Sequence, residues 1–139
     1  MLLPIIITFL LAFLLLLLKP QKFLRFFKFI CVVPLLLFLY FLTYLPSVYQ
    51  GTKSIFFKNE WIPSLGISLD FKIDGLSMLF GLMITGIGTL IYLYAAEYLK
   101  KDENIHRFYC FLTLFMGAML GVVLSDNLIT LFVFWELTS

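Results

Sequence analysis

One acidic residue lies inside an otherwise apolar stretch near the end of the sequence. Glu136 falls within residues 128–137, directly after a helix-start signal at Ser125, Asp126 and Asn127. A helix that begins near Asp126 would place Glu136 about 15 Å along its axis, close to the middle of a hydrocarbon layer about 30 Å thick. A charge at that depth costs about 2.5–3.5 kcal/mol, and such residues usually mark ion or proton pathways. We therefore expect Glu136 to carry protons; the alternative is a protonated carboxyl that hydrogen-bonds a neighbouring helix and holds a bundle together.

The composition is that of an integral membrane protein. Of the 139 residues, 63% are hydrophobic and 13% are charged, and the mean hydropathy is +1.07, far outside the range of soluble domains. The formal charge of +2 is too small to indicate nucleic-acid binding. Cys31 and Cys110 lie in apolar runs without a His or second Cys at ligand spacing, so we expect neither a metal site nor a disulfide framework. No cofactor is expected. The sequence also lacks the nucleotide-binding, zinc and nucleophile-elbow motifs of soluble enzymes.

Five apolar runs predict the architecture. Four are full-length, at residues 2–18, 29–45, 75–96 and 108–124, and a fifth starts at residue 128. The full-length runs are candidates for membrane helices, whereas residues 127–139 would reach only about 20 Å as a helix. We therefore expect an all-α integral membrane bundle with four transmembrane helices plus a truncated fifth, in a chain that is itself truncated.

The distribution of charge predicts three regions and an orientation. Residues 1–45 would hold two N-terminal transmembrane helices, residues 46–73 an extracytoplasmic loop, and residues 74–139 the third and fourth helices and the start of the fifth. The basic residues of the two other long connections mark the cytoplasmic side. They are Lys19, Lys22, Arg25 and Lys28 in the first connection, and Lys100, Lys101 and Arg107 in the second. The N-terminus is then expected outside the cell, in a multi-pass protein of the inner (plasma) membrane.

The extracytoplasmic loop carries a strand pattern. Apolar residues occupy every second position from Leu65 to Ile73, and small or charged residues alternate with them. This period of two is typical of a half-buried strand, and residues 54–61 are the expected antiparallel partner across a turn near Pro63 and Ser64. Since an isolated hairpin is marginally stable, we expect this small β-hairpin to lie over the extracytoplasmic ends of the helices.

Three polar residues are expected to cap helices. Asp74 precedes the third long apolar run, and Asp126 with Asn127 precedes the last. Side-chain oxygens at such positions accept hydrogen bonds from free backbone N–H groups of the first turn and favour the helix dipole. Capping is thus the expected role of all three, with an ion contact as the alternative for Asp126 and Asn127.

Further structural roles are expected for two glycines and an arginine. Gly117 and Gly121 form a small-xxx-small pattern, which lets another helix approach closely and would shield Glu136 from lipid. Arg107 stands at the end of a predicted loop, where a long basic side chain extends to the membrane interface.

Four segments resemble a known family. They read FKIDGLS at 71–77, RFY at 107–109, FMGAMLGVVLSDNL at 115–128 and LFVFWELTS at 131–139. Together they resemble the proton-translocating antiporter-like subunits. More narrowly, they are similar to the large A subunits of multisubunit Mrp-type Na+/H+ antiporters, whose relative is the chain 5 subunit of respiratory complex I. The resemblance covers roughly residues 61–139.

The resemblance implies a many-helix membrane subunit in which the glutamate of the WEL motif, Glu136, takes part in proton translocation with lysines on later helices. It implies a channel of two inverted five-helix repeats, each with a broken helix. This chain would supply the peripheral N-terminal helices and the glutamate. The implied partners are other membrane subunits, the ions H+ and Na+ or K+, and the lipid bilayer.

Three functions are compatible with the sequence. The first is the N-terminal part of a monovalent cation (Na+)/proton antiporter subunit. The second is a proton-pumping membrane subunit of an NADH:quinone oxidoreductase-like or hydrogenase complex, with the redox centres in other polypeptides. The third is a truncated accessory chain or remnant that does not transport. Only the second would make the chain part of an enzyme, as an NADH dehydrogenase (quinone) subunit without a redox centre of its own.

Overall fold

The computed structural model describes residues 2–17, 20–49, 54–62, 64, 67–99 and 104–139, with the backbone alone for residues 20–29, 47 and 49. In chain order the elements are α1 (Leu2–Leu17), α2 (Pro20–Leu42), α3 (Leu45–Tyr49), β1 (Ile55–Ile62), β2 (Ile67–Ile73), α4 (Gly75–Tyr98), α5 (Ile105–Leu124) and α6 (Leu128–Glu136).

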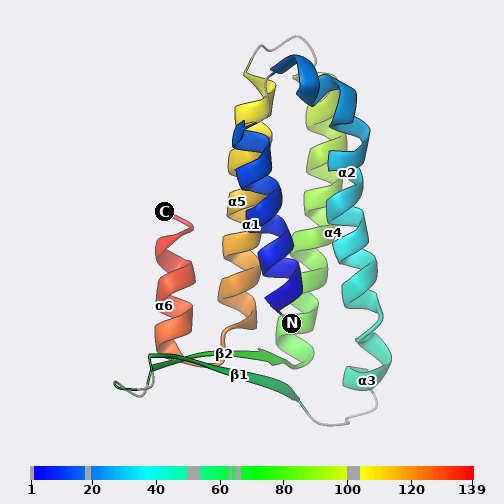
Figure 1. Ribbon diagram of the computed structural model, residues 1–139. Helices are drawn as coiled ribbons and strands as arrows, with labels where there is room; N and C mark the ends of the chain where they lie inside the picture. Colours follow the sequence, from blue (N-terminus) through cyan, green and yellow to red (C-terminus); the bar gives the residue numbers. More distant parts are fainter. Residues whose placement is uncertain (1, 18–19, 50–53, 63, 65–66, 100–103) are drawn as a thin grey trace.

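Helices α1, α2, α4 and α5 stand side by side, and the hairpin crosses one end of them (Figure 1). α1 packs against α5, α2 packs against α4, and α5 also contacts α4 and α6. The hairpin lies at the end where the N-terminus lies, and α6 rises from it on the far side of α5 (Figure 1). The fold is thus mostly helical with one small two-stranded sheet.

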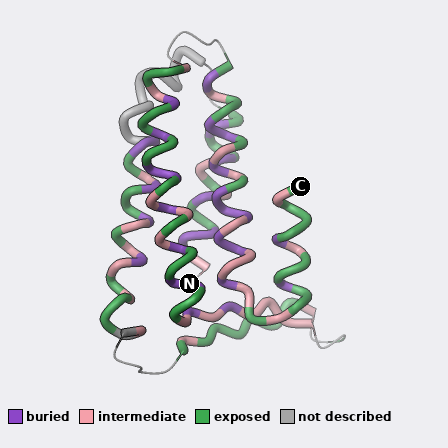
Figure 2. Tube along the Cα trace, turned by 180° about the vertical axis from the view of Figure 1, so that it is seen from behind, coloured by how far each residue is buried: buried purple, intermediate pink, exposed green. Residues whose placement is uncertain are grey.

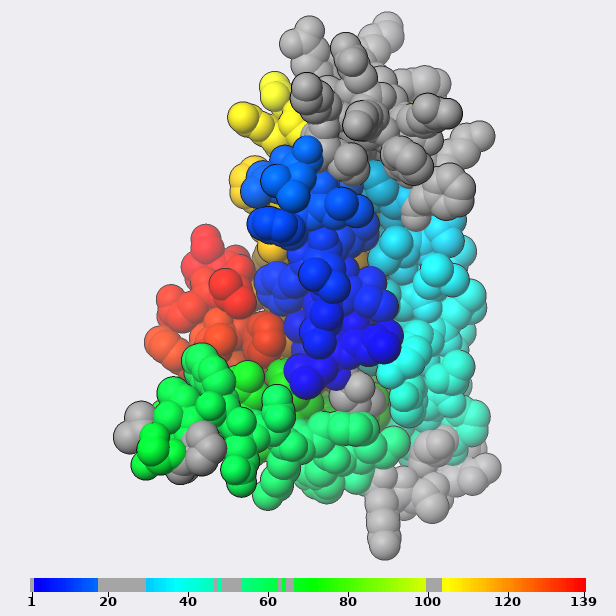
Figure 3. All heavy atoms as spheres, viewed as in Figure 1, coloured from blue at the N-terminus to red at the C-terminus, as the bar shows by residue number. Residues whose placement is uncertain are grey.

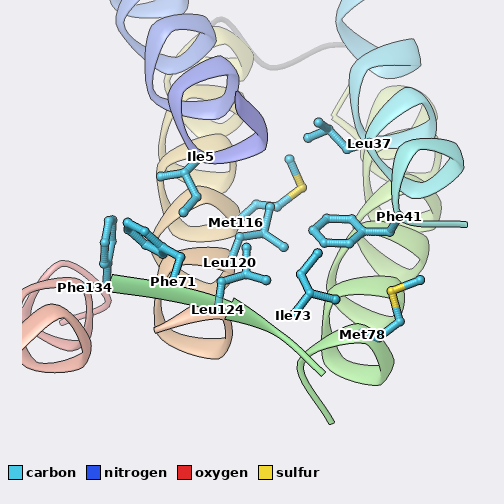
Figure 4. Close-up of a cluster of buried hydrophobic side chains, with 10 residues drawn as sticks. All are labelled: Ile5, Leu37, Phe41, Phe71, Ile73, Met78, Met116, Leu120, Leu124 and Phe134. Carbon is cyan, nitrogen blue, oxygen red and sulfur yellow. The ribbon is translucent and has the colours of Figure 1, made fainter. Parts of the chain in front are cut away.

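The buried side chains form two clusters along the bundle. The cluster nearer the hairpin is drawn in Figure 4 and consists of Ile5, Leu37, Phe41, Phe71, Ile73, Met78, Met116, Leu120, Leu124 and Phe134. It joins the hairpin and α6 to the long helices. The other cluster lies farther along the helices and consists of Ala12, Leu15, Ile30, Cys31, Tyr92, Ala95, Ile105, Tyr109 and Cys110. Both cysteines are buried and free.

Apolar side chains also cover the outside of the bundle. Leu76, Leu90 and Phe111 each expose about two thirds of their surface, and exposed positions follow the outer faces of all the long helices (Figure 2). α4 and α5 are long and apolar enough to cross a membrane, whereas α1 and the Ile30–Leu42 part of α2 are shorter apolar helices. Helices that are apolar on every side are typical of a bilayer environment.

The helix boundaries correct three sequence predictions. Lys22, Arg25 and Lys28 were expected in a connecting loop, but the backbone is helical from Pro20 onward. Proline is compatible with the first turn of a helix because its missing N–H would have no partner there, so the helix can begin before the apolar run. Arg107 is likewise on the first turn of α5 and not in a loop. The short helix α3 was not predicted. Lys19, Lys100 and Lys101 lie outside the described residues.

The predicted hairpin is confirmed. β1 and β2 pair antiparallel, with Ile55 opposite Ile73 and Phe57 opposite Phe71 and an irregularity between Glu60 and Ile62. The residues at odd positions of β2 face the helices: Phe71 and Ile73 are fully buried, and Leu69 packs against the same cluster. The period-two pattern therefore predicted the correct buried face.

Candidate functional site

Helix α6, which carries Glu136, starts at a side-chain cap. Asn127 is the cap residue, and its Oδ1 accepts a hydrogen bond of 2.7 Å from the backbone N–H of Thr130. Asp126 was expected to share this role. Its side chain is instead exposed, and its backbone N–H donates to the carbonyl oxygen of Asp70 at 2.9 Å. The correction arises because the helix begins at Leu128, which leaves Asp126 one residue too early for its side chain to reach the first turn.

One face of α6 packs against the rest of the protein. Thr130 is fully buried and Phe134, one turn later, is 9% exposed. The Phe134 ring lies edge-on to Phe71 of β2, with ring centroids 5.9 Å apart (Figure 4). It also covers Gly121 of α5 so closely that a Cβ on that glycine would collide with the ring. A glycine is therefore required there for α6 to approach α5.

Gly117 serves a different contact. A Cβ at Gly117 would collide with Thr8 of α1, whose hydroxyl donates to the carbonyl oxygen of Ile5 at 2.7 Å. The small-xxx-small pattern of α5 thus admits two neighbours, α1 at Gly117 and α6 at Gly121. Close backbone approach of this kind is the usual function of such patterns in membrane helices.

Glu136 lies on the side of α6 away from this packing. Two helical positions correspond to a rotation of about 200°, so Glu136 is nearly opposite Phe134. Its side chain is exposed. Gly121 of α5 packs against the opposite face of α6, and the shielding of Glu136 by a neighbouring helix stays a prediction. With α6 starting at Leu128, the carboxylate stands about 13 Å beyond the cap.

A group of hydrogen bonds joins strand β2 to the first turn of α6. The Asn127 Nδ2 donates to the carbonyl oxygen of Ser68 at 2.8 Å and to Asp70 Oδ2 at 3.0 Å. The backbone N–H of Asp70 donates to the hydroxyl oxygen of Thr130 at 3.1 Å. Ser68 completes the group, because its hydroxyl donates to Asp70 Oδ2 at 2.8 Å. We call Ser68, Asp70, Asn127 and Thr130 the hairpin–α6 clamp.

The start of α4 is capped by Asp74. Its Oδ1 accepts from the backbone N–H of Ser77 at 2.9 Å, and its own N–H donates to the Ser77 hydroxyl at 2.8 Å. The bond from the Ser77 N–H is the main reason that the pKa of the Asp74 carboxyl is lowered; burial opposes this effect, and Lys72, whose Nζ is 3.1 Å from Oδ2, adds to it. Asp74 therefore stays ionised and strengthens the helix start.

A buried polar cluster ties α4 to α5 at the other end of the bundle. The Tyr92 hydroxyl hydrogen-bonds the Thr113 hydroxyl, and the Tyr109 hydroxyl donates to the carbonyl oxygen of Tyr92 at 2.6 Å. All three side chains are fully buried. Cys110 extends the cluster toward α1, since its thiol lies 3.3 Å from the carbonyl oxygen of Ala12.

An open apolar groove runs between α1 and α6. It has a volume of about 790 Å³ and is lined by residues of α1, α5 and α6, among them Phe9, Leu114 and Val133. In Figure 3, α6 (red) stands on the hairpin (green) beside α1 (blue). α6 is thus supported at its base and along one face.

The structure brings some of the expected site residues together and separates others. Gly121 contacts α6 through Phe134 and Asn127 caps the same helix, whereas Glu136 lies on the opposite, exposed face of that helix. Asp74 and Arg107 lie at opposite ends of the bundle, at the starts of α4 and α5. Among the described residues, no group of three or more His, Cys, Asp or Glu is placed to hold a metal ion.

Sequence reasoning missed the contribution of Asp70 and Thr130. The alternating pattern marks Asp70 only as a polar position in a strand, and Thr130 falls within an apolar run. The spacing of Asn127 and Thr130, cap residue and third helical residue, fits a first-turn contact. No pattern in the sequence, however, pairs that turn with a strand 57 to 62 residues earlier.

Comparison with known proteins places the chain among antiporter-like subunits. Residues 61–109 match the family described as NADH-Ubiquinone oxidoreductase (complex I), chain 5 N-terminus. The A1 subunit of the Na(+)/H(+) antiporter of Staphylococcus haemolyticus is 53% identical over 121 residues, which cover 83% of this chain and 15% of that protein. The corresponding A subunit of Alkalihalophilus pseudofirmus is 57% identical over 112 residues, 80% of this chain and 14% of that protein.

A solved structure has the same fold. A chain in the structure of the Mrp complex from Dietzia sp. DQ12-45-1b matches 96% of this chain with a TM-score of 0.64 and 26% identity, over 14% of its own length. The present chain therefore spans only 14–15% of the length of these relatives. On sequence and fold together, the chain belongs to the membrane family that includes the A subunits of Na+/H+ antiporters and chain 5 of complex I.

Proposed function

We propose that this chain is the N-terminal part of a subunit of a multisubunit Na+/H+ antiporter and that it contributes Glu136 to proton translocation. The observation that carries the proposal is the 53% and 57% identity to proteins named Na(+)/H(+) antiporter subunits, supported by the fold shared with a chain of an Mrp complex. Other membrane subunits are its partners, and H+ and Na+ are the ions exchanged.

The position of Glu136 supports its role. The helix around it is apolar, and Phe132 and Trp135 are exposed beside it. A carboxyl in hydrocarbon takes up a proton when it is alone and releases it when a cation or a hydrogen-bond donor approaches. A carboxylate that points away from its own bundle can meet such a group on a neighbouring helix.

The proposal is tested by Glu136→Gln in the full antiporter assembly. Na+-dependent proton movement in everted vesicles is expected to be lost while the amount of assembled complex is unchanged, because glutamine keeps the size of the side chain but cannot exchange a proton. Glu60→Gln, a matched change at an exposed carboxylate of β1, is the control and should exchange normally. Normal exchange by Glu136→Gln would remove the assigned role.

The proposal includes the orientation of the chain, with four membrane spans, the N-terminus outside and the basic connections in the cytoplasm. Its support is that the hairpin and the N-terminus share one end of the bundle, while α5, which carries Arg107 on its first turn, starts at the other (Figure 1). A cysteine introduced at Lys58 should react with an impermeant thiol reagent in intact cells, and one at Arg107 only in everted vesicles. The opposite labelling pattern would show that the N-terminus lies in the cytoplasm.

A membrane subunit of a complex I-like enzyme is the second candidate, favoured by the match of residues 61–109 to the chain 5 family. Purification of the intact assembly separates the two candidates. Co-purification with iron–sulfur proteins, and loss of NADH oxidation when the chain is deleted, would favour the enzyme. Co-purification with small membrane subunits alone would favour the antiporter.

A further inference from the structure

We propose that the hairpin–α6 clamp is a positioning device that sets the depth and rotation of α6 and thereby the place of Glu136 in the membrane. The inference rests on the proposed function of Glu136, but the geometry that carries it lies in the contacts between β2 and α6. Within this view Asp70, Asn127 and Thr130 are positioning residues that act through Glu136.

The clamp fixes the depth of α6 because it holds both the entry and the first turn of the helix. The backbone N–H of Asp126 donates to the carbonyl oxygen of Asp70 at 2.9 Å, and Ser125 forms an isolated bridge with Phe71. β2 therefore binds the chain just before α6 along one edge, while β1 occupies its other edge. A shift of α6 along its axis would break these backbone contacts together.

The clamp fixes the rotation of α6 through two side chains on one face. Thr130 accepts from the N–H of Asp70 at 3.1 Å, and Phe134 packs on Phe71 and Gly121 one turn later. Both contacts therefore involve consecutive residues of β2. Glu136 lies on the opposite face, so any rotation about the helix axis that releases Thr130 moves the carboxylate sideways.

Asn127 has two functions in the clamp that can be separated by mutation. Its Oδ1 caps α6 by accepting from Thr130, while its Nδ2 donates to Ser68 and Asp70 on β2. Aspartate caps helices about as well as asparagine but cannot donate. Asn127→Asp therefore keeps the cap, removes both bonds to β2 and places a second carboxylate beside Asp70. Asp74→Asn, the reverse exchange at the cap of α4, is the matched control.

Thr130 offers a second and independent test. Thr130→Val has nearly the same shape but no oxygen, so the N–H of Asp70 loses its acceptor. Thr130→Ser restores the hydroxyl and should rescue the variant. A change in packing alone would affect the serine variant more, because serine lacks the methyl group of this fully buried side chain.

The test measures Na+/H+ exchange per assembled complex over a range of pH in everted vesicles. Asn127→Asp and Thr130→Val are expected to lose roughly tenfold or more in rate, since small misplacements of a reacting group cost rates of this order. The pH of half-maximal exchange should also shift, while Thr130→Ser and Asp74→Asn keep the wild-type profile. If Glu136→Gln abolishes exchange, unchanged rates and pH profiles in both clamp variants would overturn the proposal.

A readout of position separates this proposal from that for Glu136. In full-length chains that carry Glu136→Cys, the labelling rate of this cysteine by a thiol reagent should change several-fold when Thr130→Val is added. Chains without the added cysteine give the background from buried Cys31 and Cys110. Altered labelling together with normal exchange by Glu136→Gln would retain the clamp and reject the proton role. Unaltered labelling together with lost exchange by Glu136→Gln would reject the clamp and retain the proton role.

Discussion

The two ends of the bundle are held together in different ways. At the end away from the hairpin, Tyr92, Tyr109 and Thr113 are buried on all sides, and their hydroxyls bond between or within α4 and α5. At the hairpin end, α6 is held along one face and leaves Glu136 exposed on the other. Together with the function proposed for Glu136, this difference predicts a division of roles: the polar cluster between α4 and α5 stabilises the bundle, and α6 presents Glu136 to a neighbouring helix.

The largest effect is expected at the contact between α6 and α5. In Gly121→Ala the new Cβ would collide with the ring of Phe134. Overpacking of this kind costs about 1–3 kcal/mol, so α6 should move away from α5, with a loss of exchange and of thermal stability in the solubilised assembly. Phe134→Leu in the same chain should recover part of both. Gly75→Ala, whose Cβ would meet Val48 at an ordinary 4.0 Å, is the control.

A smaller effect is expected in the buried polar cluster between α4 and α5. Tyr92→Phe removes the hydroxyl that bonds Thr113, and hydrogen bonds between membrane helices contribute about 0.6 kcal/mol on average and at most about 1.7. The midpoint of thermal unfolding should fall slightly, while the pH dependence of exchange stays unchanged. Tyr94→Phe, at a side chain that is 68% exposed, should change neither. A shifted pH profile in Tyr92→Phe would contradict the division of roles.

The cap of α4 should have an effect that depends on pH. The pKa of Asp74 is lowered from its ordinary value of 3.8, so ionised Asp74 stabilises the folded state above that value. This contribution is lost as the pH falls through the lowered pKa. The difference in unfolding midpoint between wild type and Asp74→Asn, measured from neutral to acid pH, should therefore be constant near neutrality and change below pH 3.8. A constant difference down to the lowest pH would show that the charge does not contribute.

The smallest effect is expected on the outer surface of the hairpin. Lys72 pairs with Asp74 at 3.1 Å and lies 5.6 Å from the ring centre of Phe56, but both charged side chains are about one third exposed. Such pairs contribute about 0–1 kcal/mol and are screened by salt. Lys72→Gln should lower the unfolding midpoint slightly at low ionic strength and not at high. A loss of exchange in this variant would show that the outer surface of the hairpin, and not only the hairpin–α6 clamp, is needed for exchange.

The sequence predicted local structure well where one pattern dominated. The alternation from residue 67 to 73 predicted the strand and its buried face, because a period of two can satisfy only one side of a sheet. The sequence-based prediction was wrong where a cluster of basic residues indicated a loop but the backbone forms a helix. Lys22, Arg25 and Lys28 suggested a loop, yet nothing between Pro20 and Leu42 prevents a helical backbone, since Pro34 is accommodated within it.

The sequence by itself determined that this chain is a membrane protein with apolar helices, a two-stranded hairpin and one carboxylate in an apolar helix. Those features follow from composition and periodicity, which act over neighbouring residues. Only the tertiary structure decided that Gly121 receives Phe134, that Asp70 holds the start of α6, and that Glu136 faces outward. These contacts join residues 13 to 60 positions apart in the chain, and their pairing depends on how the helices and the hairpin fit together in space.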